Sequence, residues 1–260
     1  MTLQWLRNMS WWVADYAYAL HWQARAFFNT TSPRTFHSGY RTPIVIIPGI
    51  YESWKFLQPL ITSMHDRGHP VHVVQPLHLN RRPIVEAAEH VTAYLEENNL
   101  TGAIVVAHSK GGLIGKYVMA QPAAAHRVRG MLAVAVPFGG SLYARYMLPS
   151  SLRIFSPRNT TILALAREVT VNARIVSVFG QFDPHIPGGS SLRGAKNVRL
   201  DTGGHFRILA HPRVLAELTL LAQLGDRVDH HVDIEARPQP VGSVFKVRCL
   251  GSARRGGAEK

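Results

Sequence analysis

Residues 103–121 read AIVVAHSKGGLIGKYVMAQ, and this stretch gives the clearest indication of the fold. Residues 103–107 are small or β-branched and apolar, as in a buried strand. Residues 113–121 then follow a helical pattern, which Pro122 ends. The stretch therefore predicts a strand that turns sharply into a helix, with the hydroxyl of Ser109 at the turn.

The residues around Ser109 are as small as such a turn requires. Ala107 and Gly111 stand two positions before and after the serine, where larger side chains would crowd the turn. The pentapeptide departs from the Gly-x-Ser-x-Gly pattern only at its first position, which is alanine. The backbone N–H of Lys110 opens the helix and faces a developing oxyanion. We therefore predict Ser109 as a nucleophile and Lys110 as one oxyanion-hole donor.

Strand-like and helical patterns alternate along the rest of the chain. Besides 103–107, short and mostly apolar runs at 44–49, 71–74, 131–136 and 174–179 predict strands, and a further strand is expected at 197–200. Helical patterns cover 53–66, 84–97 and a closing helix from Val214. This alternation predicts an α/β fold, with a mostly parallel central sheet flanked by helices. Residues 138–172 break the rhythm and predict a cap or lid-like insertion over the site.

Three regions are expected: an aromatic amphipathic helix in residues 1–30, an α/β domain in 40–225 and a C-terminal tail in 226–260. Polar residues such as Asp15 make the N-terminal region too polar to span a bilayer. Two interpretations of this helix stay open, namely packing on the protein's own core or lying at a membrane surface, where Trp and Tyr are favoured. Its apolar residues at helical spacing are Trp5, Met9, Trp12, Val13, Tyr16 and Leu20.

The charge and composition of the chain indicate which classes of binding partner to expect. Lys and Arg number 29 against 16 Asp and Glu, a formal net charge of +13 that favours anionic partners such as a membrane surface. The basic residues are scattered without a nucleic-acid-binding motif, so nucleic acid is not expected. The single cysteine, Cys249, cannot form an internal disulfide. We expect no cofactor and no metal, and a cytoplasmic protein with peripheral membrane association as the alternative.

A serine nucleophile needs a base, and the base needs an orienting carboxylate. On folds with a strand–serine–helix turn, these residues follow in the order Ser, Asp or Glu, His. His205 lies in the loop Thr-Gly-Gly-His-Phe after the last predicted strand and is the expected base. Asp183 ends the preceding strand and is the expected acid, with Asp201 as the alternative.

The second oxyanion donor is expected in the loop after the strand at 44–49. Gly49 allows the backbone to approach closely, and the N–H of Ile50 is preferred over that of Tyr51. His108, beside the nucleophile, is expected to have a packing or supporting role rather than that of a base.

Several stretches resemble lipases and esterases of the α/β-hydrolase superfamily: IVIIPGIYES (44–53), AHSKGGL (107–113) and VPFGGS (136–141). The stretch SSLRGAKNVRLDTGGHFRILAHPRV (190–214) is similar to the C-terminal part of small bacterial triacylglycerol lipases, which also use Ala-His-Ser-x-Gly. The resemblance covers roughly residues 43–222. It implies that His205 falls on the catalytic histidine, Asp183 near the catalytic acid, and Ile50 and Lys110 at the oxyanion positions.

The resemblance implies hydrolysis of carboxylic esters, with a small acyl ester or lipid as substrate. Lys110, where Met or Gln is commoner, and the long insertion at 138–172 set this chain apart from minimal lipases. Two alternatives stay open. One is acyl transfer or thioester hydrolysis with the same triad. The other is a non-catalytic protein of this fold that binds membranes or partners.

Overall fold

The computed structural model describes residues 2–146 and 150–235. In this part of the chain, six strands form one sheet in the order β2-β1-β3-β4-β5-β6, and every neighbouring pair is parallel. The strands are β1 (Ile44–Ile47), β2 (Val71–Val73), β3 (Ala103–His108), β4 (Val128–Val134), β5 (Ile175–Phe182) and β6 (Lys196–Gly203). The predicted fold class is confirmed. The fourth strand ends earlier than expected because Ala135 has a left-handed φ of 49°.

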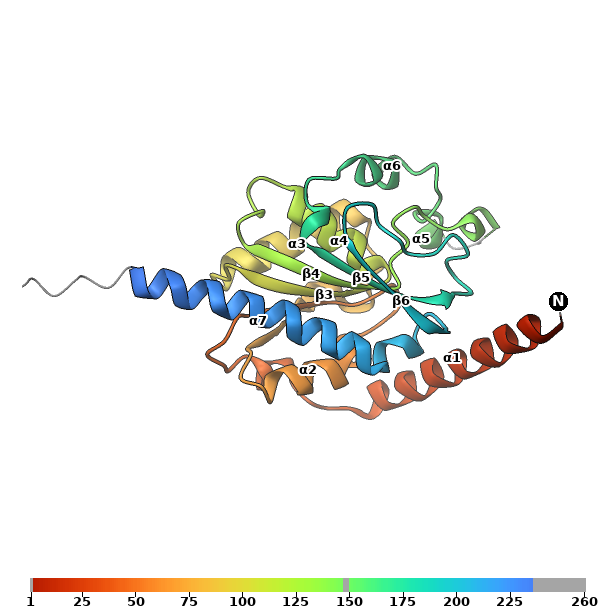
Figure 1. Cartoon of the computed structure of the whole chain (residues 1–260), viewed down its shortest axis with the longest axis horizontal. Helices are drawn as coiled ribbons and strands as arrows, with labels where there is room; N and C mark the ends of the chain where they lie inside the picture. Colours follow the sequence, from red (N-terminus) through yellow and green to blue (C-terminus); the bar gives the residue numbers. More distant parts are fainter. Residues whose placement is uncertain (1, 147–149, 236–260) are drawn as a thin grey trace, which may run out of the picture.

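Helices cover both faces of the sheet (Figure 1). One face carries α3 (Ile84–Glu97), α4 (Lys110–Ala120) and α6 (Thr160–Arg167), and the other carries α1 (Thr2–Phe28), α2 (Gln58–His65) and α7 (Pro212–Glu235). The helix α7 continues past position 226, where the tail was expected to begin. Residues 236–260, with Cys249, lie outside the described residues.

The remaining helices are short. The α5 helix (Ser150–Arg153) and η4 (Leu142–Tyr146) belong to the segment predicted as an insertion. The other 3-10 turns are η1 (Pro33–Phe36), η2 (Trp54–Leu57), η3 (Gln75–Asn80), η5 (Asn172–Arg174) and η6 (Arg207–Ala210).

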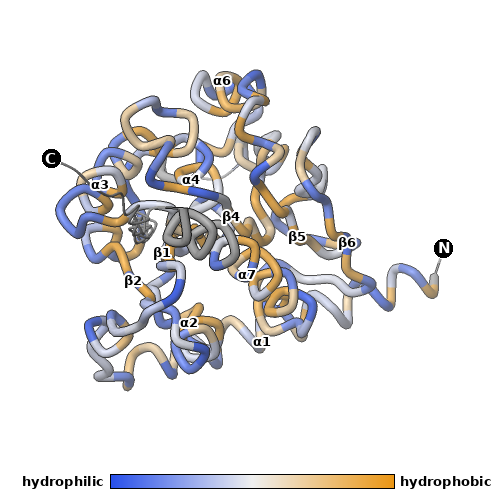
Figure 2. The backbone as a smooth tube through the Cα atoms, turned by 60° about the vertical axis from the view of Figure 1, so that its left-hand side comes forward, coloured by the Kyte–Doolittle hydropathy of each residue, from blue (hydrophilic) through white to orange (hydrophobic). Residues whose placement is uncertain are grey.

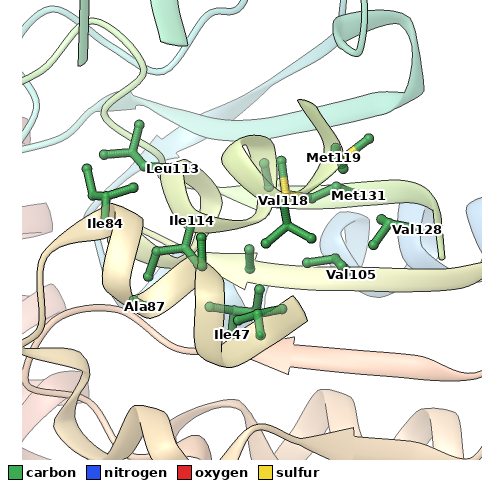
Figure 3. Close-up of a cluster of buried hydrophobic side chains, with 14 of the residues drawn as sticks. Ile47, Ile84, Ala87, Val105, Leu113, Ile114, Val118, Met119, Val128 and Met131 are labelled. Atoms are coloured by element: carbon green, nitrogen blue, oxygen red, sulfur yellow. The ribbon is translucent and has the colours of Figure 1, made fainter. Parts of the chain in front are cut away.

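Two apolar layers enclose the sheet. Along β1, Val45 and Ile47 belong to the layer beneath α3 and α4, while Ile44 and Ile46 belong to the layer against α2 and α7. This division follows from the alternation of side chains along a strand. Figure 3 shows the first layer, and Figure 2 shows hydrophobic stretches along the strands with hydrophilic ones in the outer loops. Burial on both faces explains the continuous apolar runs of β1 and β3, whereas the edge strand β6 is largely exposed and more polar.

The strand order reverses beside β1 and thereby positions the site. The chain leaves β1 for β2 on one side and returns to β3 on the other side of β1. The connections after β1 and β3 therefore diverge, and a crevice opens at the carboxyl ends of these strands. Ile50 and Ser109 follow these two strands, and Asp183 and His205 follow β5 and β6.

The α1 helix has one packed and one exposed side. Tyr18 and Trp22 pack on the apolar layer of α2 and α7. The N-terminal part of the helix extends beyond the body of the molecule (Figure 1). There Trp5 is 62% exposed, and farther along the helix Leu20 is 70% exposed. Core packing, one of the two expected interpretations, therefore accounts for only one side of this helix.

Candidate active site

Ser109 lies in the turn between β3 and α4, with φ 49° and ψ −120°. L-residues rarely adopt this conformation, and here it holds the hydroxyl above the end of the sheet. The backbone N–H of Ser109 donates to the carbonyl of Val134 at 2.9 Å. Gly111 must be glycine, because a Cβ there would collide with the backbone carbonyl of Ile47. The helix begins at Lys110, three residues before the expected 113.

The structure brings the predicted Ser109, His205 and Asp183 into one hydrogen-bonded chain. Nε2 of His205 lies 3.0 Å from Oγ of Ser109, and Nδ1 lies 2.8 Å from Oδ2 of Asp183. All three side chains are buried. The other carboxylate oxygen of Asp183 accepts the backbone N–H groups of His185 at 2.8 Å and Ile186 at 3.0 Å. The carboxylate is therefore held on both sides.

The alternative acid, Asp201, lies elsewhere. Its side chain is exposed on β6 and accepts a hydrogen bond from the side-chain amide of Gln181. Strand geometry explains the difference: Asp201 still belongs to β6, whereas Asp183 follows the last residue of β5 and can turn over the sheet edge.

Charges around the pair shift both pKa values. Burial alone would lower the pKa of His205, but the neighbouring Asp183 carboxylate, followed by Glu52 and Asp15, raises it above the ordinary value. Burial alone would raise the pKa of Asp183, but the charge and hydrogen bond of His205 lower it. The lowered pKa of Asp183 favours its carboxylate form, and the raised pKa of His205 makes its ring a better proton acceptor.

Both predicted oxyanion residues border Ser109. As the first residue of α4, Lys110 has a backbone N–H that no residue of its own helix can accept. Ile50 follows β1 and lines the cavity above Ser109. The alternative donor, Tyr51, has its N–H engaged with the carbonyl of Leu79 at 2.7 Å, which favours Ile50 as the free donor.

The side chain of Lys110 has a role that the sequence did not indicate. It is fully buried, and its Nζ donates to the backbone carbonyls of Asn80, at 2.7 Å, and Arg82. Burial lowers the pKa of Lys110 to about 8. The side-chain amide of Asn80 in turn donates to the carbonyl of Pro48 at 2.7 Å. Lys110 thus holds the loop that supports the segment containing Ile50.

Comparisons with solved structures bear on the fold. The mature form of Bacillus licheniformis lipase BlEst2 is 18% identical with a TM-score of 0.54, covering 70% of this chain and 92% of that one. MGS-MChE2, an alpha/beta hydrolase enzyme from the metagenome of sediments of the Mar Chica lagoon, is 17% identical with a TM-score of 0.51, covering 74% and 94%. Aspergillus fumigatus lipase B is 13% identical with a TM-score of 0.54, covering 72% and 53%.

This chain has the α/β-hydrolase fold. No protein-family model matches its sequence. No curated protein matches it either. The likeness is therefore one of structure at low sequence identity, and it agrees with the resemblance found in the motifs.

On this hydrolase fold, a cavity of about 290 Å³ opens above Ser109. Side chains from α1, the loop after β1 and the predicted insertion line it. Apolar groups dominate, among them Ala19, Ile50, Phe56, Leu152, Phe155 and Ile186. Leu152 and Phe155 belong to the segment predicted as an insertion.

His108 and Glu52 form a buried pair beside the Ser109–His205–Asp183 chain. Nδ1 of His108 lies 2.8 Å from the Glu52 carboxylate, and Nε2 lies 3.0 Å from the backbone carbonyl of His205. These contacts agree with the expected supporting role of His108. The sequence patterns did not indicate the role of Glu52. The sequence feature that could have indicated it is the spacing: Glu52 lies three residues after Gly49, and its carboxylate accepts the Gly49 N–H at 2.8 Å.

Within residues 2–146 and 150–235, no group of three or more His, Cys, Asp or Glu side chains is placed to hold a metal ion. Over the same residues, no helix combines the length and apolar character needed to cross a membrane.

Proposed function

We propose that this chain is a serine hydrolase that cleaves carboxylic esters through an acyl-enzyme intermediate. The observation that carries the proposal is the buried chain from Ser109 through His205 to Asp183, with contacts of 3.0 and 2.8 Å. A hydroxyl, an imidazole and a carboxylate in this order form the arrangement that activates serine nucleophiles.

Acylation begins when Oγ of Ser109 attacks the ester carbonyl carbon. Nε2 of His205 takes the hydroxyl proton, while Asp183 holds the other ring nitrogen and stabilises the resulting imidazolium. The carbonyl oxygen becomes an oxyanion, which accepts from the backbone N–H groups of Ile50 and Lys110. When the tetrahedral intermediate collapses, His205 returns the proton to the departing alkoxide and the acyl group stays on Ser109.

Deacylation repeats these steps with water. His205 removes a proton from a water molecule as its oxygen attacks the acyl carbon, and the same two N–H groups bind the second oxyanion. The proton then passes to Oγ of Ser109, and the carboxylic acid leaves. Both half-reactions use one base and one oxyanion hole.

The cavity supports an ester with a short or medium apolar acyl chain. Its volume of about 290 Å³ lies at the lower end of the range for small-molecule sites, roughly 300–1,000 Å³. Phe155 and Leu152 would contact the chain, and neither side chain offers a partner to a charged group. Two of the structurally similar proteins are named lipases, which supports esters as the substrate class.

The exposed side of α1 supports a lipid surface as the partner. Trp5, Met9 and Trp12 line a groove of about 470 Å³ together with Tyr143 of the insertion. Farther along the same helix, Gln23 lines the cavity above Ser109. Trp and Tyr favour the membrane interface, and the net charge of +13 favours anionic lipid. We propose that this side of α1 rests on anionic lipid with the cavity nearby.

A chain-length series of p-nitrophenyl esters tests the proposed function. Ser109→Ala should lower kcat by about 10⁴-fold or more, because the nucleophile is lost. The control is Ser10→Ala, which removes an exposed hydroxyl on α1 and should keep normal activity. Short and medium chains should be hydrolysed faster than long ones. Near-normal esterase activity of Ser109→Ala would overturn the proposal.

A further inference from the structure

The first helix reaches the loop that carries His205. The carboxylate of Asp15 on α1 accepts the backbone N–H of His205 at 2.9 Å, and those of Phe206 and Arg207 at 2.8 Å each. The Asp15 side chain is completely buried. Three consecutive backbone donors thus meet a buried negative charge, and such charge-assisted hydrogen bonds are among the stronger ones in proteins.

The sequence of this loop fits the helix closely. A Cβ on Gly204, which has φ 121°, would lie 2.6 Å from Oδ1 of Asp15. A Cβ on Gly203 would lie 2.5 Å from the ring of Trp11, one helical turn before Asp15. The two glycines before His205 therefore allow α1 to approach the backbone, and they leave the loop with little conformational restraint of its own.

We propose that Asp15 is a positioning residue for His205, and that α1 acts as a clamp on the loop of the base. The inference rests on the proposed role of His205. The imidazole must keep its 3.0 Å contact with Ser109 while it is attached to a glycine-rich loop. Asp15 fixes the backbone on both sides of the His205 side chain, and this is the kind of restraint that a productive geometry needs.

Asp15 also acts on His205 through its charge. Asp183 has the largest effect among the carboxylates that raise the pKa of His205, and Glu52 and Asp15 add to it. The rings of His108 and His185 also face His205, and Tyr16 lies behind His185. With these groups unchanged, neutralising Asp15 should lower the pKa of His205 and move the acid limb of kcat/KM to lower pH.

The test is Asp15→Asn, which keeps the shape of the side chain and removes its charge. Its matched control is Asp226→Asn, because Asp226 also accepts a backbone N–H, that of Thr42 at 3.0 Å, but lies on α7. We expect kcat of Asp15→Asn to fall about 10- to 100-fold, as displaced catalytic groups do. Its acid limb should move to lower pH, while Asp226→Asn keeps both the normal rate and the normal limb.

An Asp15→Asn variant with an unchanged rate and an unchanged pH profile would overturn the clamp. A loss of rate that matches the unfolded fraction, with an unmoved acid limb, would do the same. Activity of Ser109→Ala, measured in parallel, tests the proposed function separately, since that variant should be inactive whatever Asp15 does.

Amide hydrogen exchange on the wild-type chain gives a second test, for which no variant has to fold. The amides of His205, Phe206 and Arg207 should exchange slowly, because each donates to the buried Asp15 carboxylate. Rapid exchange of all three at neutral pH would contradict the clamp.

Discussion

Nδ1 of His108 lies 2.8 Å from the Glu52 carboxylate, and both side chains are buried. Nε2 of His108 faces the backbone carbonyl of His205, which can only accept, so this nitrogen carries a proton. Because Glu52 holds the N–H of Gly49 too, the pair ties the oxyanion loop to the loop of the base.

Glu52→Gln should therefore destabilise the fold. A glutamine is neutral, and its NH₂ group would replace one of the two carboxylate oxygens that lie 2.8 Å from Nδ1 of His108, so the buried pair is broken. We expect the free energy of unfolding in urea to fall by about 3 kcal/mol, as for other broken buried pairs. Glu86→Gln is the control, because Glu86 forms an exposed ion pair with Arg82 and should cost less than about 1 kcal/mol. Equal losses in the two variants would refute the role of the pair.

The pH dependence of kcat/KM follows from the raised pKa of His205. The base must be neutral to accept a proton, so activity falls as the pH drops through this pKa. The midpoint of the acid limb should therefore lie above 6.5, the ordinary value for histidine. A midpoint below 6.5 would show that burial outweighs Asp183.

The assignment of the acid is tested by two asparagine variants. Asp183→Asn should lower kcat by about 10⁴-fold, because the imidazole loses its orienting partner. Asp201→Asn should keep near-normal kcat, since Asp201 is exposed and contacts Gln181. The reverse result in steady-state kinetics would make Asp201 the acid.

The strained backbone of Ser109 predicts a difference between two inactive variants. Glycine tolerates a φ of 49° more readily than alanine does. Ser109→Gly should therefore unfold with a free energy about 1 kcal/mol higher than that of Ser109→Ala, within the cost of strained residues. Identical urea midpoints would mean that the turn carries no strain.

Vesicle binding tests the exposed side of α1. Trp5→Gln combined with Trp12→Gln should weaken binding to vesicles rich in phosphatidylglycerol by about tenfold or more, since two large apolar side chains are removed. Hydrolysis of a short soluble ester should stay the same. Leu224→Gln, at a residue that is 61% exposed on α7, is the control. Unchanged binding of the double variant in a sedimentation assay would count against the lipid surface.

Local sequence patterns were sufficient to predict most of the fold and the three residues of the candidate site. Strands such as β1 and β3 could be predicted because they are short apolar runs buried on both faces, and Ser109 could be found because its turn needs small neighbours. The order of the chain pointed to Asp183 and His205, which the structure places in contact with each other.

Contacts between distant segments could not be predicted. Asp15 looked like a polar interruption in an apolar helix, and its partner His205 lies 190 residues later. Glu52 follows β1, and His108, 56 residues later, ends the neighbouring β3, but nothing in either local pattern indicates that their side chains meet. The buried side chain of Lys110 was equally hidden, because lysine is usually exposed.

Labelling with a fluorophosphonate, followed by peptide mass spectrometry, tests directly whether Ser109 is the nucleophile. An activated serine should form one adduct, on Ser109, and labelling should be lost in Ser109→Ala and strongly slowed when His205 is replaced by alanine. Esterase activity should disappear in step with labelling. An active, folded protein with no adduct on Ser109, or with the adduct on another residue, would contradict the claim that Ser109 is the nucleophile.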